Sequence, residues 1–170
     1  WRRVLTSDEA RKKFENDGSL PIGCPSTLLE LRGFLDDAML MKHIGMFGKT
    51  RKSFDSFMCW VDIHEFKSIA NDADDFKRSK AGHIYNKYLK DGAMLRLKDI
   101  TTECCDTVEA ALKSAKRDKS PLSVNMFDEI QQRTLSDIFT DIFQPFKYSS
   151  AYNDIMTNMQ ERYNKIQPDD

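Results

Sequence analysis

Few residue combinations in this sequence could carry out chemistry. His64 stands beside Glu65, which could pair a general base with a carboxylate. Both lie in an apolar helical pattern, however, and adjacent residues on a helix do not face each other. A histidine in the core or at its edge is therefore the better interpretation of His64. No Gly-rich phosphate loop, HExxH motif or GxSxG motif occurs, so the sequence predicts no self-contained catalytic site.

Metal and cofactor sites are equally hard to place. The acidic run at residues 72–75 could suggest calcium, but an EF-hand loop needs a central glycine and a terminal glutamate. Those positions hold Lys77 and His83, so the run is expected to be a solvated linker. The cysteines and histidines are Cys24, Cys59, Cys104, Cys105, His43, His64 and His83. They show no paired zinc-ligand spacing and no CxxC motif, which predicts reduced cytosolic thiols, no metal and no cofactor.

Composition limits the remaining classes of function. The chain has 170 residues, 40% hydrophobic and 31% charged, as expected for one globular domain. Lys plus Arg (26) almost equals Asp plus Glu (27), and no basic stripe interleaves with the aromatics, so nucleic acid is not an expected partner. No apolar run approaches the roughly 20 residues that a membrane span needs. We expect a monomeric, cytoplasmic domain of a larger protein, because no initiator Met is present.

Helical periodicity dominates the chain and must position whatever site it has. The expected helices begin at or near Ser7, Ser26, Met39, Ser53, Ser79, Asp106, Ser120 and Phe146. The helix over 53–69 has the widest apolar face, and the pattern that starts at Ser120-Pro121 runs as far as Phe143. These signals predict eight or nine short helices with short connections.

The stretch around Pro145 raises a question about function. Proline lacks a backbone N–H and clashes with the preceding turn, so it should end or kink the apolar run there. One interpretation is a joint between two core helices. The other is a loop that presents residues to a partner.

Two blocks of residues carry a resemblance to a known family. The first holds Phe47, Trp60, Glu65, Phe66 and Lys67, and the second holds Phe127, Asp128, Gln131, Asp141, Phe146, Ser149 or Ser150, and Tyr152. The chain resembles an RGS-homology domain, the module that regulates heterotrimeric G-protein signalling. The resemblance covers about residues 26–157 and is weakest over 92–120.

The resemblance implies an all-α bundle of about nine helices in two lobes. Residues 1–25 would form a helical extension packed on the domain, 26–157 the domain itself, and 158–170 the end of the last helix and a tail. The implied partner is the Gα subunit of a heterotrimeric G protein, in its GTP-bound or transition-state form. Such a domain is no enzyme, because it accelerates GTP hydrolysis without a catalytic group of its own. Binding to Gα could bring it to the membrane.

The resemblance also implies a Gα-binding set carried by three interhelical loops. Its members here are Asp55, Ser56, Ser114, Asp118, Asp137, Asp141, Ile142 and Pro145. Ser56 replaces a longer amide of the family, and Pro145 replaces an arginine. Weak acceleration of GTP hydrolysis is therefore expected. The alternative is a non-activating scaffold on the same fold, in which Phe54 and Ile142 could be anchors for another partner.

Overall fold

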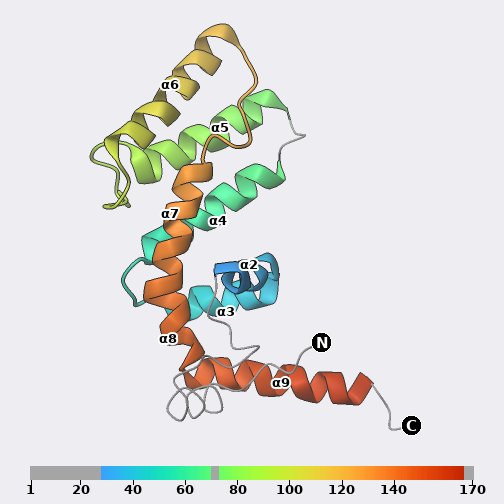
Figure 1. Cartoon of the computed structure of the whole chain (residues 1–170). Coiled ribbons are helices and arrows are strands. Elements are labelled where there is room, and N and C mark those ends of the chain that lie inside the picture. Colours follow the sequence, from blue (N-terminus) through green and yellow to red (C-terminus); the bar gives the residue numbers. More distant parts are fainter. Residues whose placement is uncertain (1–27, 70–72, 167–170) are drawn as a thin grey trace. The chain divides into compact units, whose positions relative to one another are not determined.

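The computed structural model describes residues 28–69 and 73–166. Every regular element in these ranges is a helix, which confirms the predicted all-α class (Figure 1). The chain forms two compact units: unit 1 holds Trp1–Arg51 and Phe139–Asp170, and unit 2 holds Lys52–Ile138. The predicted helix at Ser7, Cys24 and the expected extension 1–25 lie outside the described residues. None of the described helices has both the length and the apolar character needed to cross a bilayer.

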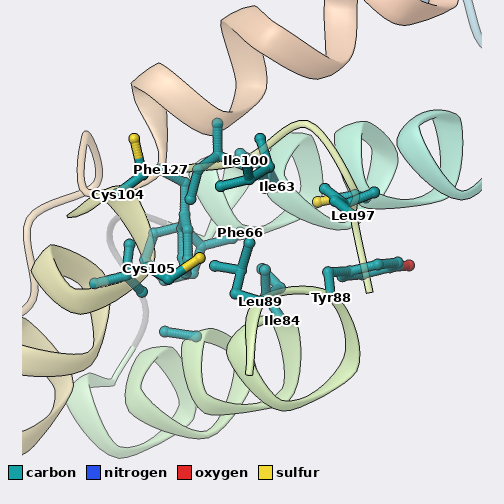
Figure 2. Close-up of a cluster of buried hydrophobic side chains, with 14 of the residues drawn as sticks. Ile63, Phe66, Ile84, Tyr88, Leu89, Leu97, Ile100, Cys104, Cys105 and Phe127 are labelled. Carbon is teal, nitrogen blue, oxygen red and sulfur yellow. The ribbon is translucent and has the colours of Figure 1, made fainter. Parts of the chain in front are cut away.

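Unit 2 is built on the pairing of its first and last helices, α4 (Phe54–Ser68) and α7 (Asp128–Ile138), with two more packed beside them. Its other elements are α5 (Asp74–Ile84), the π-helix η1 (Tyr85–Leu89) and α6 (Thr102–Asp118). In its core, the rings of Phe66 on α4 and Phe127 beside α7 meet edge-to-face, with centroids 5.3 Å apart (Figure 2). Aliphatic side chains from α5, η1 and the 90–101 connection complete this core. The predicted apolar face of residues 53–69 is thus the face that builds the unit.

Three helix starts in unit 2 differ from the sequence expectation. Helix α5 begins at Asp74 and not at Ser79, so part of the expected polar linker is helical. Ion pairs from Lys77 to Asp74 (2.9 Å) and from Arg78 to Asp75 (2.6 Å) stabilise this first turn, and the Lys77 side chain is buried. Asp74 and Asp75 thus begin the helix, because acidic residues favour a helix N-terminus.

The other two starts follow from local hydrogen bonds. Helix α6 begins one turn earlier than predicted from Asp106, because the Thr101 hydroxyl accepts a hydrogen bond from the Cys104 backbone N–H (3.3 Å). Helix α7 begins later than predicted from Ser120, at Asp128. The Ser123 hydroxyl accepts a hydrogen bond from the Asn125 N–H (3.2 Å), and such side-chain bonds favour turns over helix.

The cysteines of unit 2 contribute to its core. Cys59, Cys104 and Cys105 are buried free thiols. Burial raises the pKa values of Cys59 and Cys104, which keeps both thiols protonated. The described residues contain no group of three or more metal-ligating side chains close enough to hold an ion.

Within the described residues, unit 1 is an aromatic cluster held between four α-helices and one π-helical turn. Its elements are α2 (Leu28–Asp36), α3 (Ala38–Gly48), the π-helix η2 (Phe139–Phe143), α8 (Gln144–Lys147) and α9 (Ser150–Ile166). The Phe34 ring lies 5.3 Å from Phe143, and the Phe146 ring lies 5.3 Å from Phe47 and 5.6 Å from Tyr152. Together with the stacked rings of Phe34 and Tyr152, which lie 6.2 Å apart, these aromatic pairs link all the described helices of the unit.

Pro145 is the second residue of α8. The π-helix η2 comes directly before α8. A π-helical turn shifts the carbonyls with which a proline ring would clash in a regular α-helix. The chain turns a few residues later, where the Ser149 hydroxyl donates to the Phe146 carbonyl (2.6 Å) and accepts from the Tyr152 N–H (3.3 Å). The aromatic packing supports the first interpretation of this stretch, a joint between core helices.

Candidate functional site

The start of α4 brings two of the expected site residues together with a long-range contact. Ser53 precedes the helix in the left-handed backbone region, with φ 68°. Asp55 lies exposed in the first turn of α4, whereas Ser56 is only 6% exposed. The Ser56 hydroxyl donates a hydrogen bond to Asp137 Oδ2 on α7, at 2.9 Å. This contact ties α4 to α7.

The contact changes what Ser56 can offer to a partner. By the family resemblance, Ser56 is a short replacement for a partner-binding amide. In the structure the hydroxyl proton is committed to Asp137, and the side chain is nearly inaccessible to solvent. The pairing of these two residues could not be read from the sequence, because they are 81 positions apart.

Ser114 and Asp118 occupy a different place from the one expected. Both lie near the end of α6, where the Ser114 hydroxyl donates to Asp118 Oδ2 (3.2 Å). The hydrogen bond from Arg117 holds the pKa of Asp118 below its ordinary value. This end of α6 and the start of α4 lie at opposite ends of unit 2 (Figure 1). Residues 114–118 are thus helical and do not form a connection between helices.

The connection that joins η1 to α6 is instead residues 90–101. Gly92, which has φ 77°, allows the chain to turn out of η1. Beyond it, Met94 is 93% exposed and Leu95 is half-buried. Both line a surface hollow of about 380 Å³ together with His83, Asn86 and Lys87. The sequence predicts a helix stop at Asp91-Gly92 but no site residue here, because the resemblance is weakest over 92–120.

The remaining expected residues belong to unit 1. Asp141 and Ile142 lie in η2, and Pro145 lies in α8. Ile142 is fully buried against α3, where a Cβ built on Gly48 would stand 3.0 Å from Ile142 Cδ1. Ile142 is therefore not the exposed anchor that it could have been in the scaffold alternative. Phe54, the other anchor of that interpretation, is half-buried and stacks on Phe57 at 5.9 Å.

His64 is exposed, which corrects its expected place in or at the edge of the core. Its ring stacks on Trp60 with centroids 4.9 Å apart and an interplanar angle of 13°. The helical pattern placed His64 near the apolar stripe correctly, but the flat face of Trp60 holds the imidazole on the solvent side. Stacking accounts for this histidine without a catalytic role.

Comparison with known proteins agrees with this helical architecture. A search of the curated proteins found no match to the chain. The sequence model of the regulator of G protein signaling domain matches residues 30–155, well over half of the chain. Members of this family bind Gα subunits and accelerate GTP hydrolysis, and they are regulators without a catalytic site of their own. The chain belongs to the regulator of G protein signaling (RGS) domain family.

Proposed function

We propose that this domain binds a Gα subunit in its GTP-bound or transition-state form and accelerates GTP hydrolysis only weakly. The family match supports the partner. The Ser56–Asp137 hydrogen bond supports the weak acceleration. At the position where the family presents an amide to Gα, the Ser56 hydroxyl already donates its proton to Asp137 within the domain.

The mechanism needs no catalytic group from this chain. Gα already carries an arginine in cis and a glutamine that orients the attacking water. A domain that binds the transition-state arrangement more tightly than the ground state lowers the barrier by that difference in binding free energy. Removing one polar interaction from such an interface costs about 1–3 kcal/mol, and every 1.4 kcal/mol is about tenfold in rate. The absence of two such interactions, at Ser56 and Pro145, is enough to remove most of the acceleration.

The surface that would meet Gα differs from the one expected from the sequence. Within unit 2 we assign it to the start of α4, where Asp55 is exposed, and to the 90–101 connection, which exposes Met94. Residues 114–118 are replaced in this assignment, because they lie within α6. Unit 1 is considered by itself: there Asp141 and Pro145 stay predictions from the family resemblance, and the buried Ile142 would support their backbone. Such a domain would act in the cytoplasm and reach the membrane through Gα.

Two measurements test the proposal. In a pull-down, the domain is incubated with Gα loaded with GDP, with a GTP analogue, or with GDP and aluminium fluoride, and we expect retention to be strongest in the aluminium fluoride form.

In single-turnover GTP hydrolysis, we expect a small increase in the hydrolysis rate at a saturating concentration of the domain. Acceleration by several hundredfold would refute the weak-activity proposal, and equal or absent binding to all three forms would favour the non-activating scaffold.

A further inference from the structure

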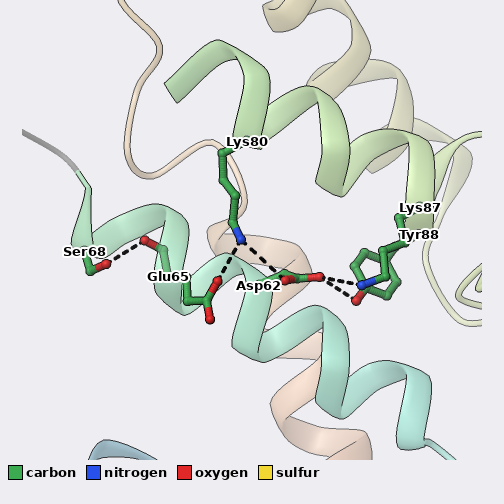
Figure 3. A network of polar contacts seen from close by, with 6 residues as sticks. All are labelled: Asp62, Glu65, Ser68, Lys80, Lys87 and Tyr88. Atoms are coloured by element: carbon green, nitrogen blue, oxygen red, sulfur yellow. Dashed lines mark hydrogen bonds and ion pairs between the residues drawn. The ribbon is translucent and has the colours of Figure 1, made fainter. Parts of the chain in front are cut away.

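Asp62 on α4 forms the centre of a polar network that reaches η1 (Figure 3). Its Oδ2 accepts hydrogen bonds from the Tyr88 hydroxyl (2.6 Å) and from the Lys87 ammonium (3.0 Å). Its Oδ1 lies 3.5 Å from Lys80 Nζ on α5, and the same Nζ lies 2.7 Å from Glu65 Oε2. One carboxylate thus binds two consecutive residues of the π-helix and one residue of the helix before it.

The network is too buried to be an ordinary surface ion pair. The Asp62 side chain is 16% exposed and Lys87 is 27% exposed, while Tyr88 is fully buried. Burial by itself would raise the pKa of Asp62, but the hydrogen bonds from Tyr88 and Lys87 outweigh it and hold that pKa below its ordinary value. Charge-assisted bonds of this kind are roughly twice as strong as neutral ones. Asp62 is therefore ionised and firmly bound to η1.

The two η1 residues that bind Asp62 also hold the 90–101 connection. The Lys87 carbonyl accepts a hydrogen bond from the Leu95 N–H (3.3 Å), and the Tyr88 carbonyl accepts one from the Leu97 N–H (3.0 Å). Leu97 is buried, whereas Met94 in the same connection is exposed. The side chains of Lys87 and Tyr88 thus point to α4 while their backbones fix the connection.

Residues 85–89 form a π-helical turn, a rare geometry that is frequently found at functional sites. The side chain of Asp62 reaches η1 in the middle of that turn, and no backbone hydrogen bond of α4 does so. A shift of η1 would move Leu95 and Leu97 with it.

We infer that Asp62 is a positioning residue: through Lys87 and Tyr88 it fixes η1 and hence the shape of the 90–101 connection. The inference rests on the proposed function for its last step, in which this connection is part of the surface that binds Gα. Asp62 itself touches no partner in this account.

Amide hydrogen exchange in the free domain tests the positioning step without any partner. We expect Asp62→Asn, which keeps the size and removes the charge, to speed exchange at the Leu95 and Leu97 amides about tenfold, equivalent to about 1.4 kcal/mol of local opening. Tyr88→Phe removes one donor and should give a smaller increase at the same amides. If Asp62→Asn does not fold, the exchange rates of Tyr88→Phe serve as the test.

Lys67→Met is the matched control. Lys67 is also on α4 and makes two contacts of similar length, to Asp128 (2.7 Å) and to Gln131 (2.7 Å), but these tie α4 to α7 and not to η1. This variant should speed exchange generally with no excess at Leu95 and Leu97. If the Asp62 variant shows no excess over the control at these two amides, the positioning role is refuted.

Binding to Gα tests the last step. We expect Asp62→Asn to weaken binding to the GDP–aluminium fluoride form about tenfold and Lys67→Met to weaken it by less than threefold. Equal losses would refute the link between the connection and the partner. A wild-type domain that binds no form of Gα refutes the proposed function together with that link, and hydrogen exchange then decides the positioning step separately.

Discussion

The contact between Ser56 and Asp137 predicts the effect of the smallest change at the start of α4. Ser56→Ala removes one hydrogen bond of 2.9 Å to a carboxylate and leaves the rest of the helix unchanged. Hydrogen bonds to charged groups are worth about 1.5–3 kcal/mol, but Asp137 retains some solvent access, so we expect a loss of about 1–2 kcal/mol in the free energy of unfolding. For a chain of this length the melting temperature should fall by about 2–8 °C.

Urea unfolding of four proteins measures this contact: wild type, Ser56→Ala, Asp137→Ala and the double variant. Asp137 has other interactions, and the cycle cancels them. We expect a coupling energy of about 1 kcal/mol between Ser56 and Asp137. A coupling below about 0.3 kcal/mol, within the additivity of independent sites, would refute the assignment.

The same contact predicts that a family-like residue at position 56 will not restore activity. Ser56→Asn must place a larger side chain where Ser56 is 6% exposed, and such overpacking costs about 1–3 kcal/mol. We therefore expect lower stability and no gain in single-turnover GTP hydrolysis. Asp55→Asn, at the exposed neighbouring position, is the control and should change stability by less than about 0.5 kcal/mol. A large gain in hydrolysis by Ser56→Asn would refute this prediction, because it would show that an amide at position 56 can reach Gα.

Three further predictions concern packing and pH. Gly48→Ala should lower the free energy of unfolding in urea by about 1–2 kcal/mol, because its Cβ would stand 3.0 Å from the buried Ile142. Gly33→Ala is the control: a Cβ there would meet nothing within 4 Å, so the free energy of unfolding should rise by up to about 1 kcal/mol. Equal effects of the two substitutions would contradict the close approach. Burial raises the pKa of Glu30 from 4.5 to about 7, so the folded state holds this proton longer, and stability should fall as the pH rises between these values. Glu30→Gln should remove that slope in urea titrations at several pH values, and an unchanged slope would refute the assignment. The hydrogen-bond donors of Asp62 outweigh its burial, so its pKa is lowered. Its contribution to the free energy of unfolding should be full above the ordinary Asp pKa and be lost as the pH falls below it. Asp62→Asn should therefore make the free energy of unfolding less dependent on pH in this acidic range.

The two ionisable groups act in opposite directions because their surroundings differ. Burial removes water from Glu30 and favours its neutral form. The positive charge of Lys147 opposes this effect but is the weaker influence, so Glu30 is held neutral to higher pH in the folded state. Asp62 loses water as well but gains hydrogen bonds from Tyr88 and Lys87, so the charged form is favoured. An unfolding experiment between about pH 3 and pH 8 should therefore separate the two groups by the sign of their slopes.

The sequence determined the helical class and most of the core. Residues such as Ile130, Leu135 and Ile138 lie in the helical pattern that was predicted and are buried, and periodicity depends only on neighbours a few positions away. The family resemblance was also carried by short blocks, and the match over residues 30–155 agrees with it. Helix starts were less accurate, because a cap such as Thr101 or a turn such as the one at Ser123 depends on one hydrogen bond.

Only the tertiary structure decided what the polar residues do. Whether Ser56 faces a partner or Asp137 depends on how α4 is aligned against α7, and two residues 81 positions apart give no local signal of that alignment. No local pattern in the sequence pairs Asp62 with η1, whereas in the structure it accepts hydrogen bonds from Tyr88 and Lys87. Local sequence sets which residues form a helix, but the partner of a buried polar group is set by the packing of whole helices.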